Sequence, residues 1–128
     1  MKRDLNLVRD ILIFFEERNS SSIVEFEEIA AATGQSDVRI VAYHVRLMWQ
    51  ANFLTCELIK SSTSDRVINA LPFELTWDGH EFLRLSREKA WEAVKQRLGD
   101  GFFDTSFDVL KALLIEYAKR QLGLGVGA

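Results

Sequence analysis

The sequence predicts a mainly α-helical protein with one small β-hairpin, an α+β fold. Apolar residues recur at helical spacing over residues 4–18 and over much of residues 76–122. Between these parts, two short helical segments are joined by the tight turn Gly34-Gln35-Ser36, and two strand-like segments follow. Helix, helix-turn-helix and hairpin in this order form a winged helix, here continued by C-terminal helices. We therefore expect a single domain over residues 1–128, with a winged-helix core at 4–86 and C-terminal helices at 87–122.

The first predicted helix, residues 4–18, carries two apolar lines rather than one. They are Leu5, Val8, Leu12 and Phe15, and Leu7, Ile11 and Phe14. A surface helix of a monomer needs a single apolar face, so two interpretations stay open. Either the helix lies at the centre of the core, or it is shared with a second copy of the chain.

Two helices form the predicted helix-turn-helix. The segment "FEEIAAATG" (26–34) predicts a short helix that Gly34 closes. The segment "QSDVRIVAYHVRLMWQAN" (35–52) predicts a longer helix, with Ser36 placed to cap it and Asp37 favourable near the positive helix N-terminus. The core-facing residues of this helix repeat at 3-4-3 spacing and are Val38, Val41, Val45 and Met48.

The next segments predict a β-hairpin. "NFLTCELIKS" (52–61) and "VINALPFELT" (67–76) alternate well enough for two strands, and the polar residues between them indicate a turn. Pro72 cannot donate a hydrogen bond to a neighbouring strand, so it marks an edge or a bulge.

Two further helices complete the predicted fold. "TWDGHEFLRLSREKAWEAVKQRL" (76–98) is helical in pattern and is expected to bend near Ser86. "TSFDVLKALLIEYAKRQL" (105–122) predicts a last amphipathic helix, with Thr105 and Asp108 in capping-box spacing.

The second helix of the helix-turn-helix presents a polar face opposite its core-facing residues. This face comprises Arg39, Tyr43, Arg46 and Gln50. Such side chains contact phosphates and base edges of DNA, and arginine suits the major-groove edge of guanine. The alternative is an ordinary solvated helix face. The predicted DNA-binding surface adds residues of the turn and of the hairpin tip, namely Gln35, Ser36, Lys60 and Arg66.

Charge and cysteine content limit the possible functions. The net charge is −3, so nucleic-acid binding would require a local basic patch. The single cysteine, Cys56, excludes an intrachain disulfide and CxxC metal spacing, and fits a reducing cytoplasm. No apolar run approaches the roughly 18 residues of a membrane span, and the first residues differ from a signal peptide. We expect a cytoplasmic protein without membrane association, in which Cys56 is a small buried strand residue.

Residues 73–83, "FELTWDGHEFL", hold the most conspicuous acid/base candidates, Asp78 and His80. Residues two apart on a helix point to different faces, so these two cannot form a local pair. We expect this segment to join the hairpin to the following helix, with Thr76 as the cap, Trp77 packed and Gly79 allowing close approach.

No other pattern indicates catalysis. His44 has no i, i+4 metal-ligand partner and is expected to be partly buried and hydrogen-bonded. Trp49, Phe53 and Trp91 are expected to pack rather than to stack on bases. Gly-rich phosphate loops, nucleophile elbows and the HExxH motif are missing. The sequence predicts no enzyme activity, no cofactor and no metal site.

Several segments resemble known winged-helix proteins. "VAYHVRLMWQANFLT" (41–55) resembles the recognition-helix-to-wing segment of ArsR- and MarR-like regulators, and "FELTWDGHEFL" is similar to the LTxxG turn of PadR- and MarR-like proteins. Where those regulators have glycine after the recognition helix, this chain has Asn52, which tolerates the left-handed conformation.

The combination of motifs resembles one family more closely. "MKRDLNLVRDIL", "VAYHVRLM", and "LTWDGHEFL" with "AWEAVKQRL" together resemble domain of unknown function 2513, a family of small bacterial and phage-associated proteins. The resemblance covers nearly the whole chain. It implies a winged helix in a cytoplasmic, often prophage-linked setting, and it supplies no activity.

Two hypotheses of function follow. The first is a non-enzymatic winged-helix protein that binds double-stranded DNA as a homodimer and regulates transcription, of phage or prophage genes according to the resemblance. The dimer would form through the first and last helices, at Leu7, Ile11, Phe14, Leu110, Leu114 and Tyr117. The alternative is a protein–protein interaction module without DNA binding, such as a phage-encoded adaptor or inhibitor. The acidic balance and an apolar pair on the flank of the recognition helix, Ile40 and Leu47, favour this alternative.

Overall fold

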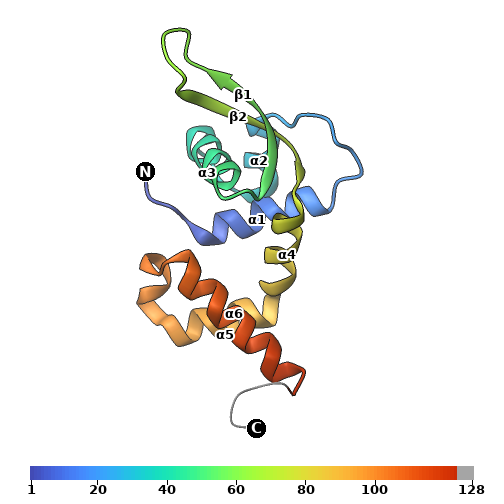
Figure 1. The fold of residues 1–128 in the computed structure, drawn as a ribbon, viewed down its shortest axis with the longest axis vertical. Coiled ribbons are helices and arrows are strands. Elements are labelled where there is room, and N and C mark those ends of the chain that lie inside the picture. Colours follow the sequence, from blue (N-terminus) through green and yellow to red (C-terminus); the bar gives the residue numbers. More distant parts are fainter. Residues whose placement is uncertain (124–128) are drawn as a thin grey trace. The chain divides into compact units, whose positions relative to one another are not determined.

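The structure, a computed structural model, describes residues 1–123 and confirms the mainly helical α+β fold (Figure 1). Its helices and strands follow the winged-helix-like order that the sequence predicts. They are α1 (Leu5–Glu16), α2 (Phe26–Thr33), α3 (Val38–Gln50), β1 (Leu54–Lys60), β2 (Val67–Leu75), α4 (Trp77–Leu85), α5 (Glu88–Leu98), the 3-10 helix η1 (Gly99–Asp104) and α6 (Phe107–Gln121). The contacts divide the chain into two compact units, with the boundary between His80 and Glu81. The single-domain assignment stays a prediction.

Helix α1 is a core helix. Asp4 caps it, because its side chain accepts hydrogen bonds from the backbone N–H groups of Asn6 and Leu7 at 2.9 and 3.3 Å. Both apolar lines are buried except at Phe14, which keeps an exposed fraction. The burial of Leu7 and Ile11 corrects the predicted dimer interface, since a side chain packed inside its own chain has no surface left for a second copy.

The turn between α2 and α3 has the predicted shape but a different cap. Gly34 adopts φ 77°, which closes α2 in the left-handed conformation. With Ser36 as the cap, α3 would begin at Asp37, but it begins one residue later, at Val38. Asp37, not Ser36, occupies the N-cap and accepts the backbone N–H of Arg39 at 2.9 Å. The side chain of Gln35 accepts the backbone N–H of Asp37 at 3.0 Å, which holds the turn in place.

Strands β1 and β2 form an antiparallel two-stranded sheet with a bulge at the predicted place. Thr55 pairs with Glu74, whereas Cys56 pairs with Pro72, so one residue of β2 is extra at this point. The carbonyl of Pro72 accepts the backbone N–H of Val24 at 2.9 Å. The chain before α2 is thereby attached to the hairpin within the first compact unit.

The joint between the hairpin and α4 is built from hydrogen bonds around Asn52 and Thr76. Asn52 has φ 62°, the predicted left-handed conformation. The Thr76 hydroxyl donates to the carbonyl of Asn52 and accepts the backbone N–H of Gly79 at 3.0 Å, which confirms Thr76 as the cap of α4. A Cβ on Gly79 would lie 2.3 Å from the carbonyl oxygen of Phe53, so the predicted close approach is also confirmed.

Trp77 differs from the expectation, because 78% of it is exposed. It lies two residues from Gly79 on α4, and residues two apart point to opposite sides of a helix. Since Gly79 faces the backbone of Phe53, Trp77 faces solvent.

The second compact unit has an aromatic core. The rings of Phe82, Phe107, Trp91 and Phe102 pack in a chain, with centroids of the Trp91 and Phe102 rings 5.3 Å apart. Ser86 is buried between α4 and α5, which confirms the break there. Helix α6 is capped by Ser106, which accepts the backbone N–H of Val109 at 3.2 Å, rather than by Thr105.

The last helix contributes its apolar residues to this core. Leu110 and Leu114 have an exposed fraction of 0%, so, like Leu7 and Ile11, they have no surface for the predicted dimer interface. Tyr117 keeps exposed surface and lines a hollow of about 160 Å³ between α5 and α6.

Candidate nucleic-acid interface

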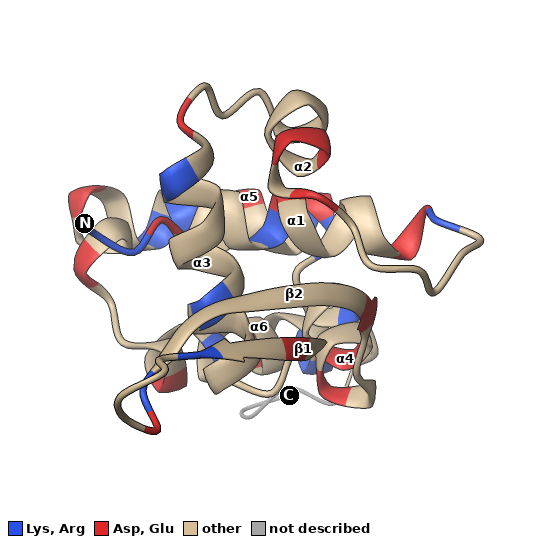
Figure 2. Ribbon diagram, turned by 90° about the horizontal axis from the view of Figure 1, so that it is seen from above, with Lys and Arg blue, Asp and Glu red and all other residues tan. Residues whose placement is uncertain are grey.

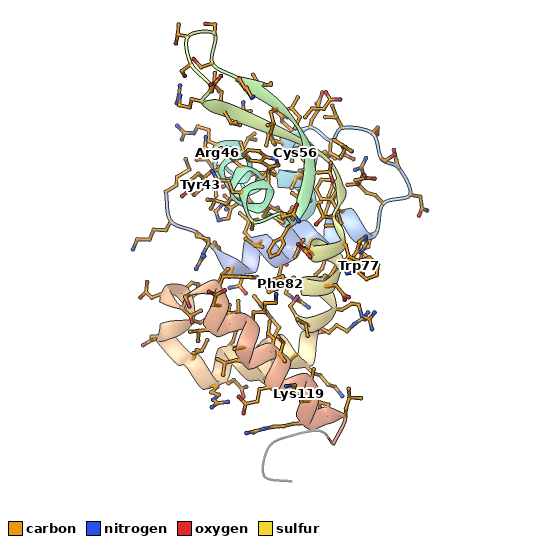
Figure 3. All side chains as sticks on the ribbon, in the orientation of Figure 1. Tyr43, Arg46, Cys56, Trp77, Phe82 and Lys119 are labelled. Atoms are coloured by element: carbon orange, nitrogen blue, oxygen red, sulfur yellow. The ribbon has the colours of Figure 1, made fainter. Side chains whose placement is uncertain are left out.

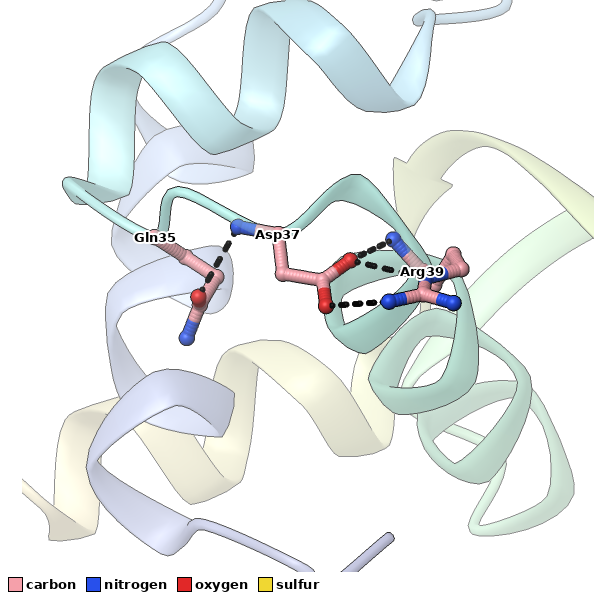
Figure 4. A network of polar contacts seen from close by, with 3 residues as sticks. All are labelled: Gln35, Asp37 and Arg39. Carbon is pink, nitrogen blue, oxygen red and sulfur yellow. Dashed lines mark hydrogen bonds and ion pairs between the residues drawn. The ribbon is translucent and has the colours of Figure 1, made fainter.

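The exposed face of α3 carries the predicted polar residues, and its first member is engaged by a carboxylate. Arg39 forms an ion pair with Asp37, with its Nη2 atom 3.2 Å from Oδ2 and its Nε atom 3.3 Å from Oδ1 (Figure 4). The hydrogen bond from Arg39 lowers the pKa of Asp37, and the carboxylate raises the pKa of Arg39. Both groups therefore stay charged, and one edge of the guanidinium is already occupied.

Tyr43 and Arg46 lie about one and two turns further along α3, and their side chains contact each other (Figure 3). The Arg46 guanidinium lies over the Tyr43 ring, 5.6 Å from its centroid, and its Nη1 atom donates to the carbonyl of Ile68 on β2 at 3.4 Å. Arg46 thus connects the helix to the hairpin. A side chain held in this way loses little further conformational freedom when it binds a ligand.

The remaining predicted DNA-binding residues lie at the two ends of this face. Gln50 and Ser36 are exposed, and Gln35 is half-buried because its side chain holds the turn. Lys60 ends β1, and Arg66 follows the hairpin tip on the other side, both exposed. The N–H of Ser61 bonds to the carbonyl of Arg66 at 2.8 Å, so the two strand ends stay together below the tip.

An open groove of about 430 Å³ runs along one flank of α3. Its lining is largely apolar and comes from four parts of the first compact unit: Met1, Phe26, Val38, Arg39, Ala42, Tyr43, Arg46 and Asn69. The apolar patch expected on the other flank is reduced, because Ile40 and Leu47 are both half-buried. Spacing along α3 could not reveal the groove, because its walls include residues far apart in the sequence.

Charge is unevenly distributed over the first compact unit. Residues 1–80 contain eight Lys and Arg against twelve Asp and Glu. Figure 2 shows cations along the segment before α1, on α3 and at the hairpin ends, whereas α2 carries acidic residues. The cations of these three parts are Lys2, Arg3, Arg39, Arg46, Lys60 and Arg66. Asp37 and Asp65 belong to the same segments. Lys2 and Arg3 were missed by the sequence reasoning, and the adjacent charges in "MKR" were the only signal.

His44 has a structural role, as expected. It is fully buried, and its Nε2 atom accepts the backbone N–H of Asp4 at 2.8 Å. Its Nδ1 atom lies 2.8 Å from the carbonyl of Ile40 and must therefore carry the proton that it donates there. His44 is thus a neutral imidazole that attaches the segment before α1 to α3.

The other residues with possible chemistry are also engaged in the fold. Asp78 accepts the side-chain N–H of Asn52 at 2.9 Å, so it belongs to the joint and not to a pair with His80. Phe53 and Trp91 are buried as expected, and Trp49 is half-buried. Cys56 is half-buried on β1, where burial raises the pKa of its thiol to about 12.

Within residues 1–123, no group of three or more His, Cys, Asp or Glu side chains could hold a metal ion. None of the helices described there is long and apolar enough to span a bilayer.

Comparison with known proteins gives a family. The model of the family described as "Hypothetical protein (DUF2513)" matches residues 2–101, which confirms the resemblance seen in the sequence. The matched region includes the first compact unit from Lys2 onward, together with α4 and α5. No curated protein and no solved structure gave a match.

Proposed function

The chain belongs to the DUF2513 family of hypothetical proteins, and from this premise we propose that it is a winged-helix DNA-binding protein acting in transcriptional control. The family description assigns no activity, so the support comes from the surface of the first compact unit. In this proposal α3 enters the major groove, and the hairpin lies along the phosphate backbone as a wing.

The observation that carries the proposal is the convergence of cations from α3 and the hairpin. Arg39 and Arg46 are seven residues, about two helical turns, apart on the same face of α3, and the carbonyl of Ile68 accepts a hydrogen bond that ties Arg46 to β2. The cationic strand ends, Lys60 and Arg66, therefore stand on the same element that α3 packs against. Base-edge contacts from α3 and phosphate contacts from a wing require this arrangement.

The net negative charge of the chain does not exclude DNA binding, but it limits the source of the affinity. Without a favourable overall field, affinity must come from the few cations at the interface. Each phosphate neutralised contributes about −0.9 to the slope of log K against log salt, so four cations predict a slope near −3.6. Affinity for a mixed-sequence duplex should then fall about 150-fold between 50 and 200 mM salt.

The test is a salt titration of duplex binding by the full chain. Arg39→Ala/Arg46→Ala should reduce the steepness of the slope by about 1.8 if both groups contact phosphate. If they contact bases, the variant should lose about 1–3 kcal/mol of discrimination at each position. Arg84→Ala/Arg87→Ala is the matched control, because both residues are exposed in the second compact unit. Absence of binding by the folded wild-type chain at 50 mM salt would refute the proposal.

The groove beside α3 favours a second candidate function, a protein-interaction module. Its apolar walls, with Phe26, Val38 and Ala42, suit a side chain of a protein partner better than a phosphate. The ion pair with Asp37 also reduces the charge that Arg39 offers to an anion. If this candidate is right, Ala42→Glu on an immobilised chain should lose a protein that both the wild type and Arg84→Glu retain. A partner retained equally by all three baits would count against the groove.

A homodimer and the lack of enzyme activity remain part of the proposal. Of the six residues predicted at the dimer interface, Phe14 and Tyr117 still have exposed surface. Sedimentation at micromolar concentration tests the dimer, and Tyr117→Asp should shift the chain toward the monomer if α6 takes part. A sedimentation profile of monomer alone, for the wild type, would remove the dimer from the proposal.

A further inference from the structure

The segment before α1, residues 1–4, is held against the recognition helix. This segment is called the arm below. Its last residue, Asp4, donates its backbone N–H to the buried Nε2 atom of His44 on α3 at 2.8 Å, and its carboxylate caps α1. The base of the arm is therefore fixed from two sides, by a side chain of α3 and by the start of α1.

The arm runs from this anchor along the exposed face of α3. Its first residue, Met1, lines the groove together with Arg39, Tyr43 and Arg46. Met1 and Asp4 are three positions apart in the chain, and an extended chain covers at most about 10 Å over that length. Lys2 and Arg3 are exposed, and in the chain they lie between Asp4, which is anchored to His44, and Met1, which lines the groove.

We infer that the arm is a third DNA-contacting element. In this inference α3 enters the major groove of the DNA, and Lys2 and Arg3 bind the phosphate backbone beside that major groove. The inference rests on the proposed DNA-binding function and adds a site to it. The arm adds two cations to those of α3, where Asp37 engages Arg39 and the Ile68 carbonyl accepts a hydrogen bond from Arg46. Short basic arms that flank a recognition helix can extend the footprint of a small domain along the backbone.

The salt slope of DNA binding measures the arm directly. With α3 and the wing alone, four cations predict a slope near −3.6, and two further phosphate contacts predict about −5.4. Lys2→Ala/Arg3→Ala should therefore bring the slope from about −5.4 back to about −3.6. Between 50 and 200 mM salt, the wild type should lose about 12-fold more affinity than this variant.

Two control variants separate a local contact from overall charge. Lys89→Ala/Lys111→Ala removes the same charge from exposed positions of the second compact unit, and should leave the slope unchanged. Lys2→Arg/Arg3→Lys keeps both charges in the arm and should retain the wild-type slope. All the substituted residues are exposed, so unfolding midpoints should differ little, and measuring them for every variant shows that binding rather than folding is compared.

Each result decides the inference. A reduced slope in the Lys2→Ala/Arg3→Ala variant alone supports it. An unchanged slope in that variant, while the wild type binds DNA, overturns the arm contact and leaves the proposed function standing. An equal reduction in the lysine control overturns it as well, since the effect would then belong to total charge. Absence of wild-type binding at 50 mM salt removes both the arm contact and the proposed function.

Discussion

Gly79 is the position where one methyl group should disturb the joint between the hairpin and α4. A Cβ built there lies 2.3 Å from the carbonyl oxygen of Phe53 and 3.2 Å from its carbonyl carbon. That carbonyl also accepts the backbone N–H of Thr76 at 3.1 Å, so it cannot move away without weakening this hydrogen bond. Gly79→Ala therefore forces the hairpin and the helix apart at their connection.

The expected size of the effect combines three contributions. Overpacking of this kind typically costs about 1–3 kcal/mol. Weakening the hydrogen bond to Phe53 adds about 0.5–1.5 kcal/mol. Alanine in place of glycine inside a helix returns about 1 kcal/mol. The free energy of unfolding of the first compact unit should therefore fall by about 0.5–3.5 kcal/mol.

Urea unfolding followed by circular dichroism measures this change. Gly101→Ala is the matched control, because a Cβ there meets nothing within 4 Å. The control should lie within about 0.5 kcal/mol of the wild type or be more stable by up to about 1 kcal/mol. If Gly79→Ala is as stable as the wild type, the close approach at the joint is not tight and the argument fails.

Three further predictions concern the first compact unit. Asp37→Ser keeps a capping side chain but removes the carboxylate that engages Arg39, so duplex affinity at 50 mM salt should rise while the salt slope, which already counts Arg39, stays near that of the wild type; a lower affinity would contradict a role of Arg39 at the interface. His44→Leu removes the acceptor for Asp4 and the donor to Ile40, and should lower the free energy of unfolding by about 1–3 kcal/mol and speed amide exchange at Asp4; unchanged exchange would mean that the arm is not anchored there. Burial raises the pKa of Cys56 to about 12, so the folded state favours the protonated thiol: its contribution to stability is present below the unfolded pKa and is lost as pH rises toward 12. A thiol reagent at pH 8 should therefore modify the unfolded chain faster than the folded one, and equal rates would contradict the shift.

Residue spacing along the sequence predicts one part of the candidate site and misses the rest. The polar face of α3 follows from spacing alone, because a helix of known register places Arg39, Tyr43, Arg46 and Gln50 on one side. The same spacing says nothing about Asp37 engaging Arg39 or about Ile68 holding Arg46, since those contacts depend on side-chain direction and on another element. The groove and the arm were missed for the same reason.

The order of helices and strands could be predicted from the sequence, because its signals act over a few residues. Gly34 and Asn52 adopt the left-handed conformations that their chemistry permits, Pro72 lies at a bulge, and Gly79 lies where a side chain would collide with a backbone carbonyl. The caps of α3 and α6 were each displaced by one residue, because two neighbouring residues could serve and local preference hardly separates them.

Burial was decided only by the tertiary structure. Helical spacing shows that an apolar residue belongs to an apolar face, but not whether that face packs against the same chain or against a partner. Ile11 and Leu114 could therefore equally have faced a partner, and Trp77 could have been packed. The contact between Asp4 and His44 joins residues 40 positions apart, and it anchors the segment that carries Lys2 and Arg3 to the recognition helix. The sequence by itself determined which segments are helices and strands and which side of α3 is polar. The packing of distant segments decided which residues remain on the surface and which cations stand together there.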